Sequence, residues 1–281
     1  MKASASSLWS ALPAAALLLA SAGSTFATFT TRSIGGDATA ASIQATVDLF
    51  RADIGNPNNG NAAGPLFGGR REINWDGGGS ATTTSGSPFF GFQNIRGAAF
   101  STPGVGNSFL QAPAAGFALQ LAQPVYATEF APFSAQRLFT PIGSNITDVT
   151  FFVPGSNGSV GATVGGFGAV FSDVDLPGFT RLQFFDLAGA EIFNQTVSPS
   201  SVRTAGFSFL GATGDAGEKI FRVRITSGNV GLGGLDSPTS DPVVMDDFFF
   251  REPTPIPEPT TVLFSLGLLG VCLGGRRRRA L

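Results

Sequence analysis

Histidine is absent from the 281 residues, and cysteine occurs once, at Cys272. Ser-His-Asp and Cys-His catalytic sets and the usual zinc sites need these residues, so they are excluded. A single cysteine cannot form a disulfide within the chain, so the fold must be stabilised by packing. Carboxylates, lysine, serine and the single tyrosine, Tyr126, are what remains for catalysis. We therefore expect a protein that is not an enzyme.

A basic surface is also missing. The formal net charge is -2, and apart from a run of arginines at the C-terminus the basic residues are scattered along the chain. Proteins that bind nucleic acid need a basic face. We therefore expect no nucleic acid among the partners.

The N-terminus has the three parts of a signal peptide. Met1-Lys2 gives a positive start, Leu8 to Leu19 is apolar, and Ala20-Ser21-Ala22 is a small-residue cleavage site. A second candidate site follows Thr25-Phe26-Ala27. We assign residues 1–27 to the signal peptide, against the alternative of a retained N-terminal anchor.

The C-terminus carries an apolar run from Thr260 to about Gly275, and four arginines follow it at once: Arg276, Arg277, Arg278 and Arg279. An apolar segment that ends in basic residues is typical of a transmembrane helix whose charged end stays in the cytoplasm. The run is shorter than the roughly 20 residues of an ordinary span, a deficit that snorkelling arginines and local thinning of the bilayer can offset.

The motif Pro257-Glu258-Pro259 precedes this run. The ordered combination of motif, short apolar segment and arginine-rich end resembles the PEP-CTERM sorting signal of exported bacterial proteins. The resemblance covers residues 253–281 and implies export, transient residence in the inner membrane, processing by an exosortase-type enzyme and delivery to the cell surface or extracellular matrix. The alternative is an ordinary membrane anchor that follows a proline-containing linker.

The segment between these ends, residues 28–252, is expected to form one domain. From Asp37 to Ile54, apolar residues recur at helical spacing, which predicts a surface helix with Asp37 or Thr39 as its N-cap. Short segments follow, separated by Gly, Pro, Asn and Ser. In Thr180–Asp186 and Lys219–Thr226, apolar residues alternate with polar and charged ones, as in strands with one buried face.

Further strands are expected at Glu72–Asp76, Phe89–Phe92, Ala98–Ser101, Ser108–Gln111, Ala127–Phe133, Thr147–Val153, Phe167–Ser172, Ala205–Leu210 and Val243–Phe250. Many short strands and 28 phenylalanines favour a mainly β fold, an antiparallel β-sandwich of jelly-roll type. The expected fold is completed by the N-terminal surface helix and the C-terminal transmembrane helix.

Two pairs of acidic residues are candidates for a structural calcium, the one cofactor we consider. Asp246 and Asp247 lie in an apolar segment, where an ionised carboxylate must be paired or bound to a cation. The segment is weakly similar to the closing strand of exported sugar-binding jelly rolls, which implies a calcium ligand. The alternative is that one aspartate binds backbone amides or an arginine while the other faces water.

Asp173 and Asp175 form the second pair, and at a strand end they point the same way, which suits an oxygen-ligand cation site. The sequence favours the alternative of a solvated turn before Pro177. Trp75, between Asn74 and Asp76, is a candidate platform for stacking a sugar, although a place in the core is favoured for this single tryptophan of the mature chain.

These features lead to one functional expectation, one catalytic alternative and the further possibility of a passive surface-layer or biofilm filler with no specific ligand. We expect an exported envelope or matrix protein whose non-catalytic sandwich binds or organises exopolysaccharide. The alternative is a glycan hydrolase or lyase that uses two carboxylates, for which no spacing in the sequence identifies a pair.

Overall fold

The computed structural model describes residues 27–257, and it consists mainly of two antiparallel β-sheets. The signal peptide up to Phe26 and the tail from Glu258 onward, with its predicted membrane helix, lie outside the described residues. Within residues 27–257, no helix has the length and apolar character needed to span a bilayer.

The first sheet has eight strands. Its order is β1 (Phe29–Gly35), β12 (Phe207–Gly214), β9 (Gly166–Ser172), β14 (Val244–Arg251), β6 (Leu138–Ile142), β5 (Ser108–Ala112) and β3 (Thr83–Gly86), with β2 (Arg70–Ile73) also paired to β14.

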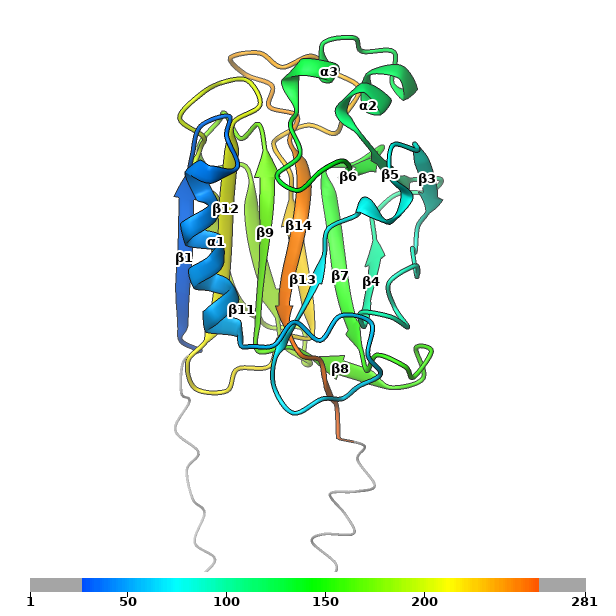
Figure 1. Cartoon of the computed structure of the whole chain (residues 1–281), viewed down its shortest axis with the longest axis vertical. Coiled ribbons are helices and arrows are strands. Elements are labelled where there is room, and N and C mark those ends of the chain that lie inside the picture. The colour runs from blue at the N-terminus through cyan, green and yellow to red at the C-terminus, as the bar shows by residue number, and fades with distance from the viewer. Residues whose placement is uncertain (1–26, 258–281) are drawn as a thin grey trace, which may run out of the picture.

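The second sheet has seven strands, in the order β11 (Glu191–Thr196), β10 (Arg181–Phe185), β13 (Arg222–Thr226), β7 (Ile146–Phe152), β8 (Gly161–Thr163) and β15 (Thr254–Pro255), with β4 (Ala98–Ser101) paired to β7. Figure 1 shows the long strands of both sheets running along the same axis.

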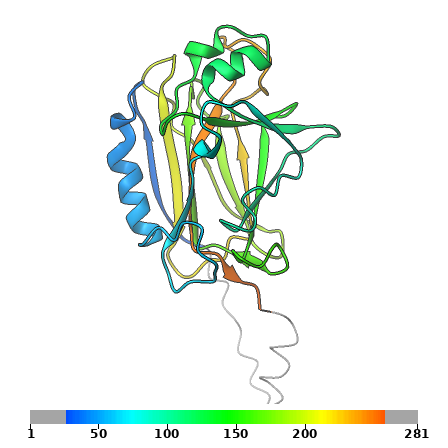
Figure 2. The same cartoon turned by 45° about the vertical axis from the view of Figure 1, so that its right-hand side comes forward.

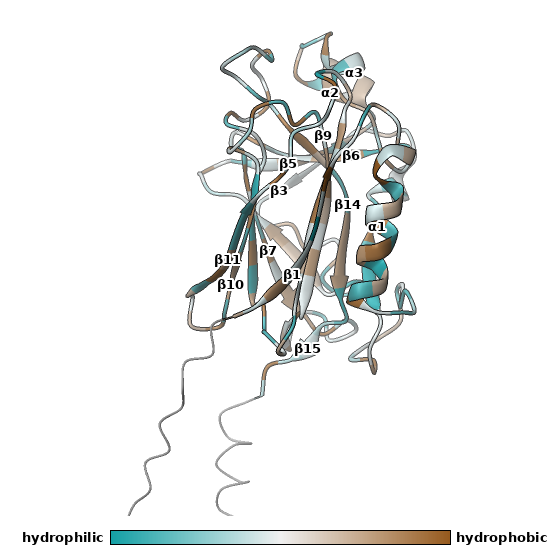
Figure 3. Cartoon of the chain, turned by 90° about the vertical axis from the view of Figure 1, so that its left-hand side faces the viewer, coloured by the Kyte–Doolittle hydropathy of each residue, from teal (hydrophilic) through white to brown (hydrophobic). Residues whose placement is uncertain are grey.

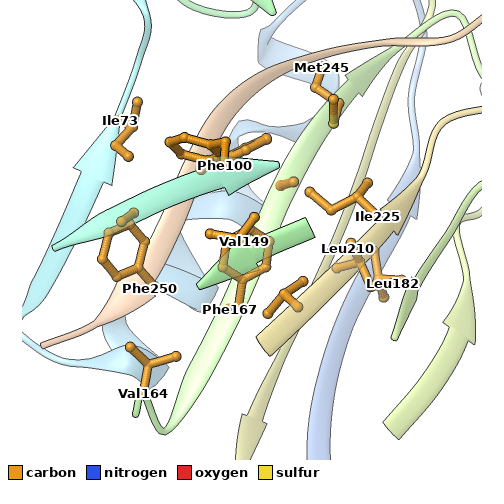
Figure 4. Packing of buried hydrophobic residues seen from close by; sticks show 14 of the residues in the cluster. Ile73, Phe100, Val149, Val164, Phe167, Leu182, Leu210, Ile225, Met245 and Phe250 are labelled. Atoms are coloured by element: carbon orange, nitrogen blue, oxygen red, sulfur yellow. The ribbon is translucent and has the colours of Figure 1, made fainter. Parts of the chain in front are cut away.

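The main core lies between the two sheets and is rich in phenylalanine. Figure 4 shows residues of both sheets meeting there, among them Phe167, Met245 and Phe250 from the first and Val149, Leu182 and Ile225 from the second. Alternation along the strands explains this, because successive side chains point to opposite faces. In β10 and β13, Leu182, Phe184, Val223 and Ile225 are buried, while the residues between them are partly exposed.

Helix α1 (Ala41–Ile54) covers the outer face of the first sheet, as Figure 2 shows. Its buried residues Ile43, Val47, Phe50 and Ile54 pack on Val170, Phe207, Phe209 and Phe249 of β9, β12 and β14. Hydrophobic and hydrophilic residues alternate along the helix ribbon in Figure 3. The predicted helix and its buried face are confirmed, but its N-cap is Ala40, and Asp37 instead accepts hydrogen bonds from Thr39.

Two short helices close one end of the sheets, at the top of Figure 1. They are α2 (Ala114–Gln120) and α3 (Tyr126–Glu129), and they pack with Leu138 and Val244 in a separate apolar cluster. Sequence predicted a strand over Ala127–Phe133, and this is wrong. The segment begins as helix α3 because Tyr126 packs against Phe130 and its hydroxyl accepts a hydrogen bond from the amide of Gly233 at 3.0 Å.

The folded part extends beyond the boundary predicted at residue 252. Thr254 and Pro255 pair with Thr163 and Ala162 of β8, and the amide of Ile256 donates to the carbonyl of Gly161 at 3.0 Å. Before this strand, Glu252 is buried and forms a two-point ion pair with Arg71, with distances of 2.6 and 2.7 Å. The chain is therefore fixed in place until just before Pro257.

Replacement of Phe248 by alanine tests the dependence on the aromatic core. Phe248 is fully buried and contacts Trp75 and Phe167 edge to face, with ring centroids 5.2 and 5.5 Å apart. We expect Phe248→Ala to lower the free energy of unfolding by about 3–5 kcal/mol in urea denaturation of the full chain. The matched control is Phe67→Ala at a fully exposed ring, for which we expect a change within about 0.5 kcal/mol. Equal losses in both variants would contradict this account of the core.

Candidate functional site

Strand β14 contains a β-bulge at Asp246 and Asp247. Met245 pairs with Phe171 and Phe248 pairs with Ala169, so three steps along β14 match two steps along β9. The extra residue breaks the strict alternation that the sequence predicts for this segment. Met245 and Phe248 consequently both face the main core, and both aspartates are buried, with exposures of 0 % and 4 %.

Asp246 is held by backbone amides. Its Oδ2 atom accepts hydrogen bonds from the amides of Phe133 at 2.5 Å and Ser134 at 3.2 Å, while its Oδ1 atom is buried without a hydrogen-bond partner. Asp247 accepts a hydrogen bond from the Ser134 hydroxyl at 2.6 Å, and its other oxygen lies 3.9 Å from Nη2 of Arg51. The sequence left open that one aspartate binds backbone amides or an arginine while the other faces water. The contacts with amides and an arginine agree with this alternative, but neither carboxylate faces water.

Burial dominates the protonation of this pair. It raises the pKa of Asp246 well above its usual range, and the neighbouring charge of Asp247 raises it further. Burial also raises the pKa of Asp247, to about 6, against the lowering effects of Ser134 and Arg51. The two side chains therefore hold at least one proton near neutral pH, which lets a protonated carboxyl donate to its neighbour.

Trp75 belongs to the core. Its ring is 1 % exposed and stacks on Phe139 with centroids 3.8 Å apart, and Phe92 and Phe100 pack against it at 5.3 Å. Its Nε1 donates to the carbonyl of Asp246 at 3.0 Å, so the indole is satisfied as well as buried. The ring has no free face for a sugar, and the interpretation as a ligand platform does not fit the structure.

Asp173 and Asp175 follow the end of β9, and the predicted solvated turn is wrong. Asp173 has a positive φ of 72° and is fully buried, and the side chain of Asp175 is 2 % exposed. Neither oxygen of Asp173 has a hydrogen-bond partner. Arg203 lies 3.6 Å from Asp175 but is 69 % exposed, so solvent screens much of its attraction.

Three further carboxylates act on Asp173 and Asp175, and together the five form what we call the acidic cluster: Glu129, Asp173, Asp175, Asp236 and Asp241. Burial, followed by the charge of Glu129, raises the pKa of Asp173 to about 10. Burial is also the main cause that raises the pKa values of Asp175 and Asp241 to about 6.

Sequence reasoning missed Glu129, Asp236 and Asp241 because they are far from Asp173 in the chain. Glu129 lies on α3, which was taken for a strand, and the other two belong to the loop between β13 and β14. Among residues 27–257, no group of three acidic side chains is already arranged to hold a metal ion. Both the acidic cluster and the Asp246–Asp247 pair therefore lack a ready-made coordination sphere.

A pocket of about 350 Å³ lies beside Trp75, under the loop that follows β3. Its lining combines apolar rings with polar groups and contains no carboxylate: Asn61, Asn74, Trp75, Gly77, Gly78, Phe89, Gly91, Phe92, Ile95, Arg96, Gln111 and Arg137. Arg96 donates from Nε to the carbonyl of Glu72 at 2.8 Å, and Arg137 donates from Nη2 to the carbonyl of Gln111 at 2.7 Å. The terminal amino groups of Arg96 donate no hydrogen bond within the described residues.

Of the predicted sorting motif, the structure describes Pro257, which is exposed two residues beyond β15. Glu258, Pro259 and the four arginines lie outside the described residues. No protein-family model matches the chain, and a search of curated proteins finds no match to it.

The protonation of the bulge gives a prediction about pH. A raised pKa in the folded chain means that stability is fully present below the unfolded value near 4 and is lost as pH rises through about 6. Asp246→Asn keeps an oxygen for the two amides and removes one titrating carboxyl. We expect the unfolding free energy of this variant, relative to that of the unmodified chain, to rise as pH increases from 4 to 7.

Denaturation of both proteins in urea at several pH values measures this difference. The other buried carboxyls are common to both proteins and cancel in the comparison. The exposed Asp215 provides the control, since Asp215→Asn should give a curve parallel to that of the unmodified chain. A constant difference between Asp246→Asn and the unmodified chain would mean that Asp246 is ionised throughout this range.

Proposed function

We propose that the chain is an exported bacterial protein of the envelope or extracellular matrix, and that its β-rich domain binds exopolysaccharide without cleaving it. The termini support export, since a signal-peptide pattern precedes the domain and a PEP-CTERM-like tail follows it. The two facing sheets support the finer proposal of a jelly-roll sandwich, an architecture that also occurs in lectin domains.

The pocket beside Trp75 is the observation that carries the binding proposal. It has the size of a small-ligand site, with half-buried rings of Phe89 and Phe92 as one wall and side-chain amides of Asn61, Asn74 and Gln111 as hydrogen-bonding groups. Arg96 and Arg137 are the charged groups of its lining. The guanidinium of Arg137 is buried and donates to the carbonyls of Trp75 and Gln111. Arg96 has its Nε bound to the carbonyl of Glu72 and its Nη1 buried, so its Nη2 is the group that can donate a charge-assisted hydrogen bond, which favours a sugar that carries an acid group.

A hydrolase or lyase with two carboxylates remains the alternative. It has less support at this pocket because the lining contains no carboxylate. The acidic pairs described above are buried elsewhere, with Asp246 and Asp173 fully enclosed. A catalytic pair must reach the glycosidic bond on both sides, and enclosed side chains cannot do so without rearrangement.

Titration calorimetry with short oligosaccharides tests the pocket. We expect the full chain in detergent to bind an oligouronide at least tenfold more tightly than a neutral oligosaccharide of equal length, with EDTA present to exclude metal bridges. Arg96→Gln should weaken uronide binding about 10- to 100-fold, because it removes a charge-assisted hydrogen bond. Arg181→Gln on the second sheet is the control and should bind normally.

Two outcomes would contradict the proposal. Unchanged uronide binding by Arg96→Gln would place the ligand elsewhere, and absence of binding to any tested polymer would remove the functional assignment. Release of new reducing ends during the titration would favour the hydrolytic alternative.

The sorting proposal has its own test in the native host. We expect mass spectrometry of the surface form to find a C-terminus near Pro257–Pro259, and the full tail to persist in a strain that lacks the exosortase. Replacement of Pro257 and Pro259 by alanine should likewise leave the tail intact, whereas Pro255→Ala outside the motif should be processed normally. A surface form that retains Arg276 to Arg279 would overturn processing.

A further inference from the structure

The acidic cluster gathers five carboxyl groups with little positive charge beside them. Its five carboxylates come from the end of β9, from α3 and from the loop between β13 and β14. The charged partner within 4 Å of these carboxylates is the guanidinium of Arg203, at 3.6 Å from Asp175 and 69 % exposed. Like charges held together in a buried place need either protons or a cation.

Four oxygen atoms of the cluster are buried and have no hydrogen-bond partner within the described residues. They are both oxygens of Asp173, Oδ2 of Asp175 and Oδ1 of Asp236. Asp173 is the clearest example, because it is fully buried and the neighbouring charges of Glu129, Asp175 and Asp236 all raise its pKa. Buried carboxylate oxygens in folded proteins are almost always bound by a donor or a cation.

The Asp246–Asp247 pair is better satisfied, although Oδ1 of Asp246 is also buried without a hydrogen-bond partner. Asp246 accepts two backbone amides, and Asp247 has a serine hydroxyl and a nearby arginine. Asp241 is similar, since its two oxygens accept hydrogen bonds from the amides of Asp175 and Leu176. Within the cluster, Asp173, Asp175 and Asp236 are therefore the groups with buried oxygens that lack donors, and Asp173 lacks a donor at both of its oxygens.

We propose that the acidic cluster binds calcium through Asp173, Asp175 and Asp236, with Glu129 as a further ligand. Calcium prefers six to eight oxygen ligands and tolerates irregular geometry, whereas magnesium demands a nearly ideal octahedron. Side-chain rotation must bring the carboxylates together, because they do not converge before binding. Asp241 acts as a positioning residue, since it holds the backbone that carries Asp175.

The location indicates what calcium would do. The hydroxyl of Tyr126 on α3 accepts a hydrogen bond from the amide of Gly233 in the loop between β13 and β14. Glu129 follows Tyr126 on α3, and Asp236 follows Gly233 in the loop. A cation shared by α3, β9 and the loop would tie together the three segments that close this end of the domain, at the top of Figure 1. The inference is independent of the sugar pocket.

Thermal unfolding of the full chain, stripped with EDTA and kept in detergent at pH 7.5, tests the site with calcium chloride alone. We expect 10 mM calcium to raise Tm by about 5–10 °C for a dissociation constant near 10⁻⁴ M, and magnesium at the same concentration to give less than half of that rise. Asp173→Asn should abolish the calcium-dependent rise. The exposed Asp215→Asn makes the same chemical change outside the cluster and should retain it.

Two other variants keep the test decisive if Asp173→Asn fails to fold. Asp236→Asn, at a half-buried position, should weaken calcium binding at least tenfold in calorimetry, and Arg203→Gln should strengthen it several-fold by removing the competing cation. A purely structural role of these residues would not produce opposite changes in calcium affinity.

Shared protons are the rival explanation of the buried carboxylates. They predict that calcium leaves Tm unchanged and that Asp173→Asn is more stable than the unmodified chain with or without the ion. That result would overturn the proposal, as would a calcium response that Asp173→Asn retains. No sugar enters the assay, so its outcome is separate from the binding test of the pocket.

Discussion

Contact between two sheets through aromatic rings is the constraint on which this domain depends. No disulfide is available, so the apolar face of each sheet must be buried against the other. Phe139, Phe167 and Phe248 occupy the interface, and Trp75 fits among them with its ring parallel to that of Phe139. Each polar group within such a core needs a hydrogen-bond partner, and the indole of Trp75 donates to the carbonyl of Asp246.

The bulge in β14 follows from this constraint. An unbroken strand would alternate strictly and could not send both Met245 and Phe248 into the same core. The inserted residue makes this possible and leaves Asp246 and Asp247 buried, where the amides of Phe133 and Ser134 compensate one of them. The same need for compensation applies at the end of β9, where Asp173 has no donor. The two groups of buried acids therefore differ in how far their oxygens are satisfied by hydrogen-bond donors.

The parts of the fold that depend on local period were predictable from the sequence. Helix α1 and its four buried residues follow from helical spacing, and β10 and β13 follow from strict alternation. Strand β11 was not predicted because it lies at a sheet edge and is polar. Helix α3 was wrongly predicted as a strand because tertiary contacts of Tyr126 determine its conformation.

The sites were less predictable than the elements. Asp173, Asp175, Asp246 and Asp247 stand out in the sequence as acids in apolar surroundings, and all four are buried in the structure. Their partners come from distant segments, and a bulge of one residue changes which face each side chain occupies. The pocket beside Trp75 is lined by five separate segments of the chain, so no local sequence pattern predicts it.

The positions of the two ends add an argument about orientation. Strand β1 starts and β15 ends at the same end of the domain, opposite α2 and α3 (Figure 1). If the tail enters the membrane as proposed, the short connection after β15 holds this end close to the bilayer, because the chain remains paired with β8 up to Ile256. The acidic cluster, at the end of the domain that carries α3, would then face away from the membrane. If the tail is processed as proposed, the sorting enzyme must accept a motif that begins two residues after β15 and directly after Ile256, whose amide is bonded to Gly161. The ion pair of Arg71 and Glu252 keeps the preceding segment from lengthening the linker.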